Sequence, residues 1–171
     1  MTQATYLLDT NILIQPYRTY YAMDLCPGFW DFLEKEFSAG QAFSIEKVYY
    51  EIIRNTDELT QWVKNSVDKR SFVDQSKDNL VITQYEKVSN WVMDSKQFSG
   101  SAKREFLLPN EADPWICAYA SIYSSIVVTG EGYRPGARNK VPLPNVLQAF
   151  EVPYIDIYDF LRKEHARFIS G

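Results

Sequence analysis

Histidine and cysteine are scarce in this chain, and their scarcity removes several classes of enzyme from consideration. The single histidine, His165, lies in the charged stretch "RKEHARF", where a solvated surface position is expected. A Ser/His/Asp or Cys/His mechanism would have to be built around it, and no GxSxG elbow accompanies it. Cys26 and Cys117 form no CxxC or Cys/His group, which argues against a structural zinc site and a disulfide framework. Carboxylates are left to carry most of any chemistry.

Long apolar runs and phosphate-binding loops are missing as well. No stretch approaches the roughly 20 apolar residues that cross a bilayer, and "MTQATYLL" has neither a basic start nor a long apolar run of signal-peptide type. We therefore expect a cytoplasmic protein without a membrane partner. Without a Walker A or GxGxxG loop, nucleotide hydrolysis and dinucleotide redox chemistry lack support. The net charge of -4 excludes a global basic field, although a local basic loop could still hold phosphates.

Large apolar side chains are abundant, and they predict a globule. Apolar residues make up 46% of the 171 positions and aromatic residues 15%. This length suits one domain with a sizeable core, and no repeat or linker divides it, so we expect a single domain over 1–171.

Short apolar stretches alternate with amphipathic ones along the chain. Strands are expected up to Asp9 and at 41–45, 125–130 and 154–155, and helices at 28–37, 46–55, 57–66, 80–96, 113–123 and 145–150, with a closing helix after the last strand. The Ser- and Gly-containing stretch 98–112 is interpreted as a break, and 131–144 as a loop. This alternation predicts an α/β fold, a three-layer α/β/α sandwich with a short, mainly parallel sheet.

Two aspartates occupy places where local structure alone could require an acid. In "YLLDTN", Asp9 follows the first expected strand, and "DTN" could form an Asx-type turn or a helix cap. In "NEADPW", Asp113 precedes Pro114, a pattern typical of an N-cap with proline at the first helical position. A carboxylate held at a helix start is also fixed in direction, so capping and a role in a site are compatible.

Two glutamates complete a set of acids. Glu51 lies in a helical pattern, where most glutamates are solvated flank residues, and Glu131 directly follows the "VVTG" strand, where an acid without function is common. An α/β topology can nevertheless bring all four acids to one edge, because sites form beyond the carboxyl ends of parallel strands. Carboxylates packed together repel each other, and a divalent cation relieves that repulsion. Oxygen ligands favour Mg²⁺ or Mn²⁺.

At these stretches the sequence resembles the PIN-like domains. The resemblance rests on "LLDTN", "FSIEKVYYEI", "EADPWICAYA" and "IVVTGE", and it covers nearly the whole chain. It is closest to the branch that ends in a K-x-P…N-V loop and a "YIDIYDFLR" type of tail, here "KVPLPNVLQAF" and "YIDIYDFLR". PIN domains are Mg²⁺- or Mn²⁺-dependent ribonucleases, and many are VapC-type toxins restrained by an antitoxin. The resemblance thus implies an RNA substrate, a divalent cation and an antitoxin or other regulatory protein as partner.

The resemblance also assigns roles to residues. It places Asp9, Glu51 and Asp113 in the acidic metal site that carries the catalysis. The family usually has Asp or Asn two residues beyond the threonine of the following strand, and this chain departs from that pattern with Glu131, our fourth candidate ligand. Polar supports for ligands or phosphate are expected at Asn11, Ser44 and Thr129. Candidates for RNA contacts follow Glu131 in a loop that could equally be only solvated: Tyr133, Arg134, Arg138 and Lys140.

Two rival interpretations remain beside the ribonuclease. A phosphoryl-transfer enzyme of haloacid-dehalogenase type also begins with a strand that ends in Asp, but it needs a second Asp where this chain has Asn11. The stronger rival is a catalytically inactive PIN-like module that binds a regulatory protein. A homodimer is a further candidate assembly.

Overall fold

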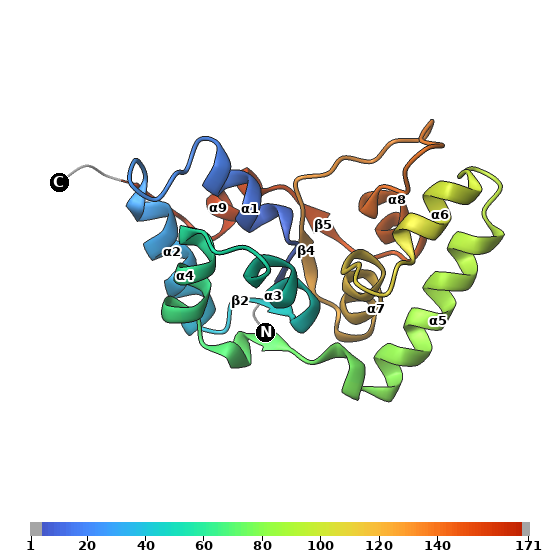
Figure 1. The fold of residues 1–171 in the computed structure, drawn as a ribbon, viewed down its shortest axis with the longest axis horizontal. Helices are drawn as coiled ribbons and strands as arrows, with labels where there is room; N and C mark the ends of the chain where they lie inside the picture. The colour runs from blue at the N-terminus through green and yellow to red at the C-terminus, as the bar shows by residue number, and fades with distance from the viewer. Residues whose placement is uncertain (1–4, 169–171) are drawn as a thin grey trace.

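The structure, a computed structural model, describes residues 5–168 and contains a parallel sheet of five strands in the order β3-β2-β1-β4-β5 (Figure 1). Every neighbouring pair of strands is parallel. The strands are short: β1 Tyr6–Leu8, β2 Ala42–Ile45, β3 Phe72–Val73, β4 Ile126–Val128 and β5 Tyr154–Ile155.

The order of the strands creates a switch point at the middle of the sheet. From β1 the chain moves outward to β2 and β3, and it then returns to add β4 and β5 on the other side of β1. Leu8 pairs with Val128 at the carboxyl ends of β1 and β4. In open parallel sheets, ligands bind at the point where the chain reverses its direction of winding. The ends of β1 and β4 are therefore the expected place for a site.

Helices flank the sheet in two groups, and the three-layer α/β/α fold predicted from the sequence is confirmed. Figure 1 shows α2, α4 and α9 toward one end of the molecule and α5, α6, α7 and α8 toward the other. The helices are α1 Asn11–Arg18, α2 Pro27–Ser38, α3 Glu46–Ile53, α4 Glu58–Ser66, α5 Asn79–Asp94, α6 Gly100–Phe106, α7 Asp113–Tyr123, α8 Leu143–Ala149 and α9 Ile157–Lys163, with single 3₁₀ turns η1 Lys69–Ser71 and η2 Gln75–Lys77.

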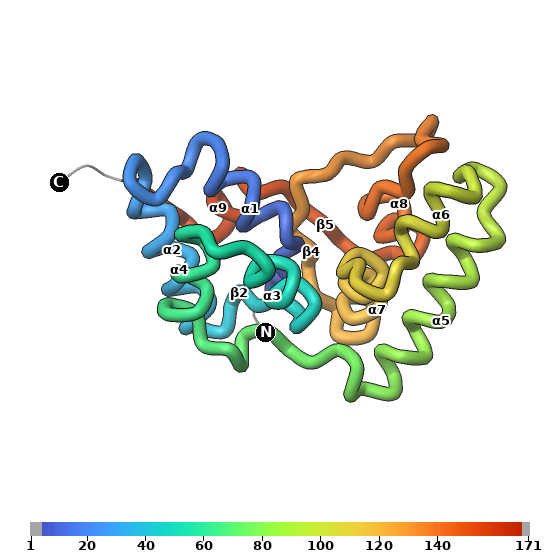
Figure 2. Tube along the Cα trace, viewed as in Figure 1, coloured from blue at the N-terminus to red at the C-terminus, as the bar shows by residue number. Residues whose placement is uncertain are grey.

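Aromatic side chains join the helices to each other and to the sheet. Trp30 of α2 meets Trp62 of α4 edge to face, with ring centroids 4.9 Å apart. Tyr85 of α5 stacks on Trp115 of α7 at 4.0 Å, where α5 runs beside α7 in Figure 2 although 18 residues separate the two helices. Such pairs add to area burial in holding helices together. Aromatic packing thus holds together the helices of each of the two groups that flank the sheet.

The expected strands are confirmed, but several other elements differ from the predictions. Helix α1 directly follows β1 where only a turn was expected, and the two-residue strand β3 was not foreseen. The supposed break at 98–112 contains α6, because Ser99 caps that helix by accepting a hydrogen bond from the Ala102 amide at 3.2 Å. Ser99 and Gly100 therefore mark the start of α6 and not a break in the helical pattern. Among the helices of the described part of the chain, none combines the length and the apolarity that a bilayer crossing requires.

Candidate functional site

Polar side chains meet at the carboxyl ends of β1 and β4. The Thr129 hydroxyl donates a hydrogen bond to Asp9 Oδ2 at 2.9 Å, and both residues are buried. The Asp9 amide donates to the Val128 carbonyl at 3.0 Å, which extends the ladder between the two strands by one step. Ser44 of β2 is fully buried and donates to the Leu8 carbonyl at 2.6 Å, just before Asp9. Thr129 therefore orients the Asp9 carboxylate, and Ser44 fixes the backbone beneath it.

Burial and neighbouring charge disfavour the ionised form of Asp9. Its exposed fraction is 2%, and burial is the largest cause that raises the pKa of its carboxyl from 3.8. The hydrogen bonds from Thr129 and from the Thr10 backbone lower the pKa, the negative charges of Glu131 and Glu51 raise it, and together these effects place it at about 6. Shifts of this kind cluster at functional sites. The folded protein would therefore be more stable with an uncharged side chain in the place of the Asp9 carboxylate.

Asp113 belongs to the same electrostatic group. It is the first residue of α7, and its pKa is raised well above the usual range, first by burial and then by the charges of Asp9, Glu131 and Glu111, while Lys140 lowers it. The expected N-cap is wrong: Ala112 holds the cap position and Asp113 forms no capping hydrogen bond. The physical reason is that Asp113 already lies inside the first helical turn, before Pro114. Its carboxylate lies in the first turn of α7 and forms no capping hydrogen bond.

Glu51 is held by a residue that the sequence did not indicate. The Thr10 hydroxyl donates a hydrogen bond to Glu51 Oε2 at 2.8 Å, which joins the start of α1 to α3. Thr10 is buried, with an exposed fraction of 4%. Its position in "DTN" next to Asp9 was visible in the sequence, but the direction of its side chain was not. Glu51 thus lies beside Asp9 as expected, with its orientation set from the same loop.

Glu131 is bound by its own loop. It forms a salt bridge with Lys140, and its second carboxylate oxygen accepts a hydrogen bond from the Leu143 amide at 3.0 Å. Lys140, a candidate for RNA contact, is therefore engaged with an acid in this structure. Its positive charge also reaches Asp113. Lys140 therefore acts as a counter-charge to the four acids Asp9, Glu51, Asp113 and Glu131, which we call the acidic edge.

The acids are neighbours without forming a closed set of ligands. Within residues 5–168, no group of three His, Cys, Asp or Glu side chains is arranged so that it could hold a metal ion. The chemistry of the donors nevertheless suits a hard cation, because carboxylate oxygens are the ligands of Mg²⁺ and Mn²⁺. Mutual repulsion at Asp9 and Asp113 is the condition that a bound cation relieves. Metal ligation by the four acids stays a prediction.

The loop 131–142 carries the remaining RNA candidates, and two amide side chains fasten it. Tyr133, Arg134 and Arg138 are exposed. Asn145 of α8 accepts from the Arg134 amide at 2.9 Å and donates to the Arg134 carbonyl at 2.8 Å. Gln97 donates to the Pro135 and Ala137 carbonyls at 3.0 and 3.1 Å. Sequence reasoning missed both amides, since nothing in their spacing distinguishes them from surface residues.

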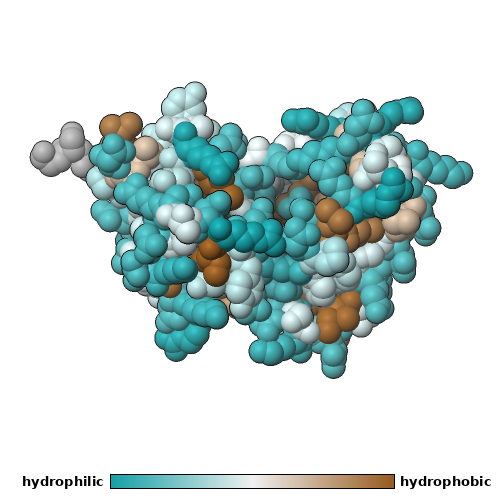
Figure 3. All heavy atoms as spheres, in the orientation of Figure 1, coloured by the Kyte–Doolittle hydropathy of each residue, from teal (hydrophilic) through white to brown (hydrophobic). Residues whose placement is uncertain are grey.

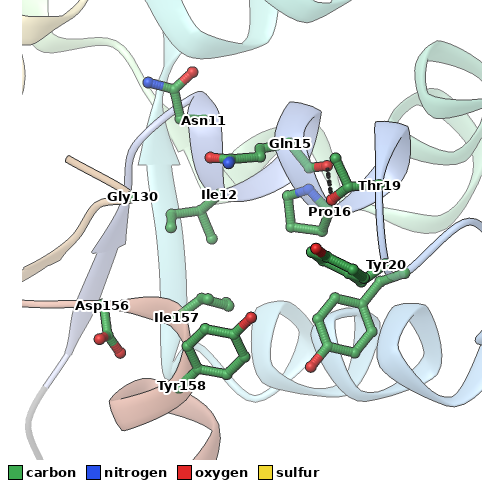
Figure 4. Close-up of a pocket in the computed structure, with 11 residues that line it drawn as sticks. Asn11, Ile12, Gln15, Pro16, Thr19, Tyr20, Gly130, Asp156, Ile157 and Tyr158 are labelled. Carbon is green, nitrogen blue, oxygen red and sulfur yellow. Dashed lines mark hydrogen bonds between the residues drawn. The ribbon is translucent and has the colours of Figure 1, made fainter.

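A pocket lies beside the carboxyl end of β4, between α1 and the start of α9. The residues that line it come from α1, from the turn after α1, from the end of β4 and from the start of α9, and they include Asn11, Gln15, Tyr20, Gly130, Asp156 and Tyr158 (Figure 4). Asn11, expected as a support for the acids, is exposed at the first turn of α1 and faces this pocket. In Figure 3 the upper outline of the molecule dips between the end that carries α1 and α2 and the end that carries α6 and α8.

Comparison with known proteins supports the fold. The structure is similar to a chain in the crystal structure of FitAcB from Neisseria gonorrhoeae, with a TM-score of 0.51 and 15% sequence identity, over 88% of this chain and 96% of that one. At this identity the likeness concerns the fold alone. No curated protein sequence matches the chain. A family model described as a domain of unknown function, DUF4411, matches residues 6–168, and the chain therefore belongs to the DUF4411 family.

Proposed function

We propose that the protein is a ribonuclease that hydrolyses RNA phosphodiester bonds with Mg²⁺ or Mn²⁺ held by Asp9, Glu51, Asp113 and Glu131. The observation that carries this proposal is the buried Asp9, joined to Thr129 at the switch point of the sheet, with the charges of Glu51 and Glu131 acting on it. A buried carboxylate among other acids destabilises the fold, so its presence calls for a positively charged ligand.

Each side chain has a role that its position supports. Asp9 and Asp113 would bind the cation most directly, because neither carboxylate caps a helix. Thr129 and Thr10 orient Asp9 and Glu51. The chemistry supplied by Mg²⁺ or Mn²⁺ at such a site is neutralisation of phosphate charge and activation of water. A carboxylate oxygen of Asp113, which receives no capping hydrogen bond, accepts the proton of the attacking water.

The loop 131–142 supplies the positive charge for the RNA backbone. Arg134 and Arg138 are exposed, and the hydrogen bonds from Gln97 and Asn145 hold the loop carbonyls in place. Contacts of this kind position a nucleic acid without reading its sequence. The resemblance to VapC-type toxins adds an antitoxin as the protein partner. Expression of the wild-type chain in a bacterial host is then expected to arrest growth, and Asp9→Asn to relieve the arrest.

A catalytically inactive PIN-like interaction module is the second candidate. It is favoured by two observations: within the described residues no three acids are arranged to hold a metal ion, and Lys140 already pairs with Glu131. In this reading the salt bridge is permanent, and the acidic edge binds a basic segment of a partner protein.

Cleavage assays separate the two candidates. Purified wild-type protein with Mn²⁺ or Mg²⁺ is expected to cleave RNA, and EDTA, Asp9→Asn or Asp113→Asn to abolish cleavage. Asp68→Asn is the matched control, because Asp68 is an exposed acid paired with Arg70 away from the site. Equal cleavage by all three variants would reveal a contaminating nuclease. Absence of cleavage by the wild type, with each cation and with single-stranded and structured RNA, would support the inactive module.

A further inference from the structure

The pocket beside the acidic edge has features that suit a nucleotide base. We propose that it receives one unpaired base of a single-stranded RNA, next to the phosphodiester that meets Asp9. The inference rests on the proposed ribonuclease function and deepens it, since it assigns this pocket as the subsite for one base of the RNA. Tyr20, Tyr158, Gln15, Asn11 and Gly130 are the residues that form the subsite.

Two tyrosines present their rings to the pocket. Tyr20 is 83% exposed and Tyr158 is 47% exposed, although both are large aromatic residues. In Figure 4 the ring of Tyr158 lies across the pocket from the turn that carries Thr19 and Tyr20. The adjacent Tyr21 is already stacked on Phe29 at 4.5 Å, so it forms a fixed wall. Exposed rings around a hollow are platforms on which any base can stack.

Two amide side chains on α1 supply polar groups for the edge of a base. Asn11 and Gln15 are four residues apart, so they lie on the same side of the helix, and both are exposed. An amide offers both donors and acceptors, which matches the mixed pattern on the edge of a nucleobase. Figure 4 shows the Gln15 amide directed toward Gly130. Aromatic faces and amide edges together recognise a base by stacking and by hydrogen bonds.

Gly130 links the pocket to the acids. It follows Thr129, whose hydroxyl holds Asp9, so the pocket begins one residue from the proposed reaction centre. A Cβ atom at this position would lie 3.2 Å from Gln15 Oε1, so the Gln15 amide would have to shift by a few tenths of an ångström. The absence of a side chain at Gly130 lets the amide reach the end of β4. A base in the pocket would therefore be attached to a phosphate close to Asp9.

The charge of the pocket favours a neutral base over a phosphate. Asp156 is the only charged residue among those of the described chain that line it, and no Lys or Arg does. The Asp156 carboxylate caps α9 by accepting a hydrogen bond from the Asp159 amide at 2.8 Å. A phosphate would be repelled by this acid. The backbone of the RNA would instead run toward Arg134 and Arg138 in the loop on the other side of Asp9.

Binding measured without cleavage tests the subsite. A fluorescein-labelled single-stranded RNA of mixed sequence is titrated in EDTA with the wild type, Tyr20→Ala, Tyr158→Ala and Gly130→Ala, and anisotropy gives each Kd. We expect Tyr20→Ala and Tyr158→Ala each to bind about tenfold more weakly, the effect of losing 1.4 kcal/mol, and Gly130→Ala to weaken binding by a smaller factor, because it only displaces the Gln15 amide. Tyr20→Trp, which keeps a ring, is expected to restore binding. Tyr123→Ala is the control, because Tyr123 is another exposed tyrosine and does not line the pocket.

A second experiment tests whether the group that binds in the pocket is a base. The same RNA is made as a series with one abasic nucleotide at each position in turn. At one position, loss of the base should weaken wild-type binding about tenfold and leave the binding of Tyr20→Ala unchanged, since the two losses remove the same contact. The blunt-ended duplex of the same sequence should bind the wild type and Tyr20→Ala equally.

The outcomes distinguish this inference from the proposed function. Unchanged Kd values for Tyr20→Ala, Tyr158→Ala and Gly130→Ala overturn the subsite even if the protein cleaves RNA. Absence of wild-type binding in EDTA also overturns it. A self-association that Tyr20→Ala abolishes, with no effect on RNA, would show that the pocket receives a second copy of the chain. Conversely, intact base-dependent binding without any cleavage would confirm the subsite and contradict the ribonuclease.

Discussion

The Thr10 hydroxyl donates a hydrogen bond to the Glu51 carboxylate at 2.8 Å, across a separation of 41 residues in the sequence. This contact joins the loop that carries Asp9 to helix α3, so one short stretch of chain orients two acids. Thr10 is buried and contacts no reacting atom itself. It is a positioning residue, and its effect on activity would act through Glu51.

Replacement of Thr10 tests this role. Thr10→Val keeps the shape of the side chain and removes the hydroxyl, so Glu51 loses its partner without a cavity being formed. Loss of a residue that orients a metal ligand costs about 10- to 100-fold in metal affinity or activity. We expect that loss in Mn²⁺ affinity measured by calorimetry and in the rate of RNA cleavage. Thr10→Ser, which retains the hydroxyl, should recover most of both, and equal deficits in the two variants would contradict the assignment.

The raised pKa of Asp9 predicts how stability varies with pH. The native carboxyl has a pKa of about 6, against an ordinary value of 3.8, so the folded protein binds this proton more tightly than the unfolded chain does. Protonated Asp9 therefore contributes fully to stability below about pH 4. This contribution is lost as the pH rises through about 6, and the free energy of unfolding falls by about 3 kcal/mol in total. Asp9→Asn should be more stable than the wild type at pH 7.5 and should lack this slope.

Urea denaturation between pH 4 and 7.5 measures the effect. Asp68→Asn is the control, because it changes an exposed acid. Mn²⁺ should raise the melting temperature of the wild type more than that of Asp9→Asn, since the cation relieves the repulsion only where the carboxylate is present. If Asp9→Asn were less stable than the wild type at every pH, the unfavourable burial of Asp9 would be contradicted.

The sequence predicts the sheet better than it predicts the contacts that complete the site. The strands β1 and β4 are short apolar runs that are followed directly by Asp9 and Thr129, and parallel topology brings such strand ends together. The place of Asp9 at the edge followed from this alone. By contrast, β3 is too short to have a periodicity, and α1 contains Pro16, which obscured its helical pattern.

Side-chain directions account for most of what could not be predicted. Thr10 and Asp113 each stand at a helix start, and their sequence neighbours are compatible with capping or with a turn toward the acids. The salt bridge between Glu131 and Lys140 depends on the path of the intervening loop, which is set by distant amides such as Gln97. These choices are made by tertiary packing, so the local pattern carries no signal for them.

The pairing of Lys140 with Glu131 predicts competition with metal. Lys140 places a positive charge among the acids and lowers the pKa of Asp113. Lys140→Met removes that charge and keeps much of the apolar stem, so we expect a several-fold gain in Mn²⁺ affinity by calorimetry, together with weaker binding of RNA. Arg138→Met, in the same loop, should weaken RNA binding without the gain in metal affinity. Unchanged Mn²⁺ affinity in Lys140→Met would show that the lysine does not compete.

The hydrogen bonds of Gln97 predict that it controls the order of the loop 131–142. Its amide donates to the carbonyls of Pro135 and Ala137, so Gln97→Ala leaves these groups to water, and a loss of about 1 kcal/mol in the free energy of unfolding is expected. The larger effect should be local. Trypsin does not readily cut at Arg134, which precedes Pro135, but it can cut after Arg138 when the loop opens.

Limited trypsin digestion measures that opening, because cleavage in a loop reports how often the segment leaves its folded position. Cleavage after Arg138 should be several-fold faster in Gln97→Ala than in the wild type. Gln148→Ala is the matched control, since Gln148 is exposed on α8 and donates no hydrogen bond to the loop. Equal rates in all three proteins would mean that the other contacts of the loop, including the hydrogen bond from the Ser99 amide to the Arg138 carbonyl, hold it without Gln97.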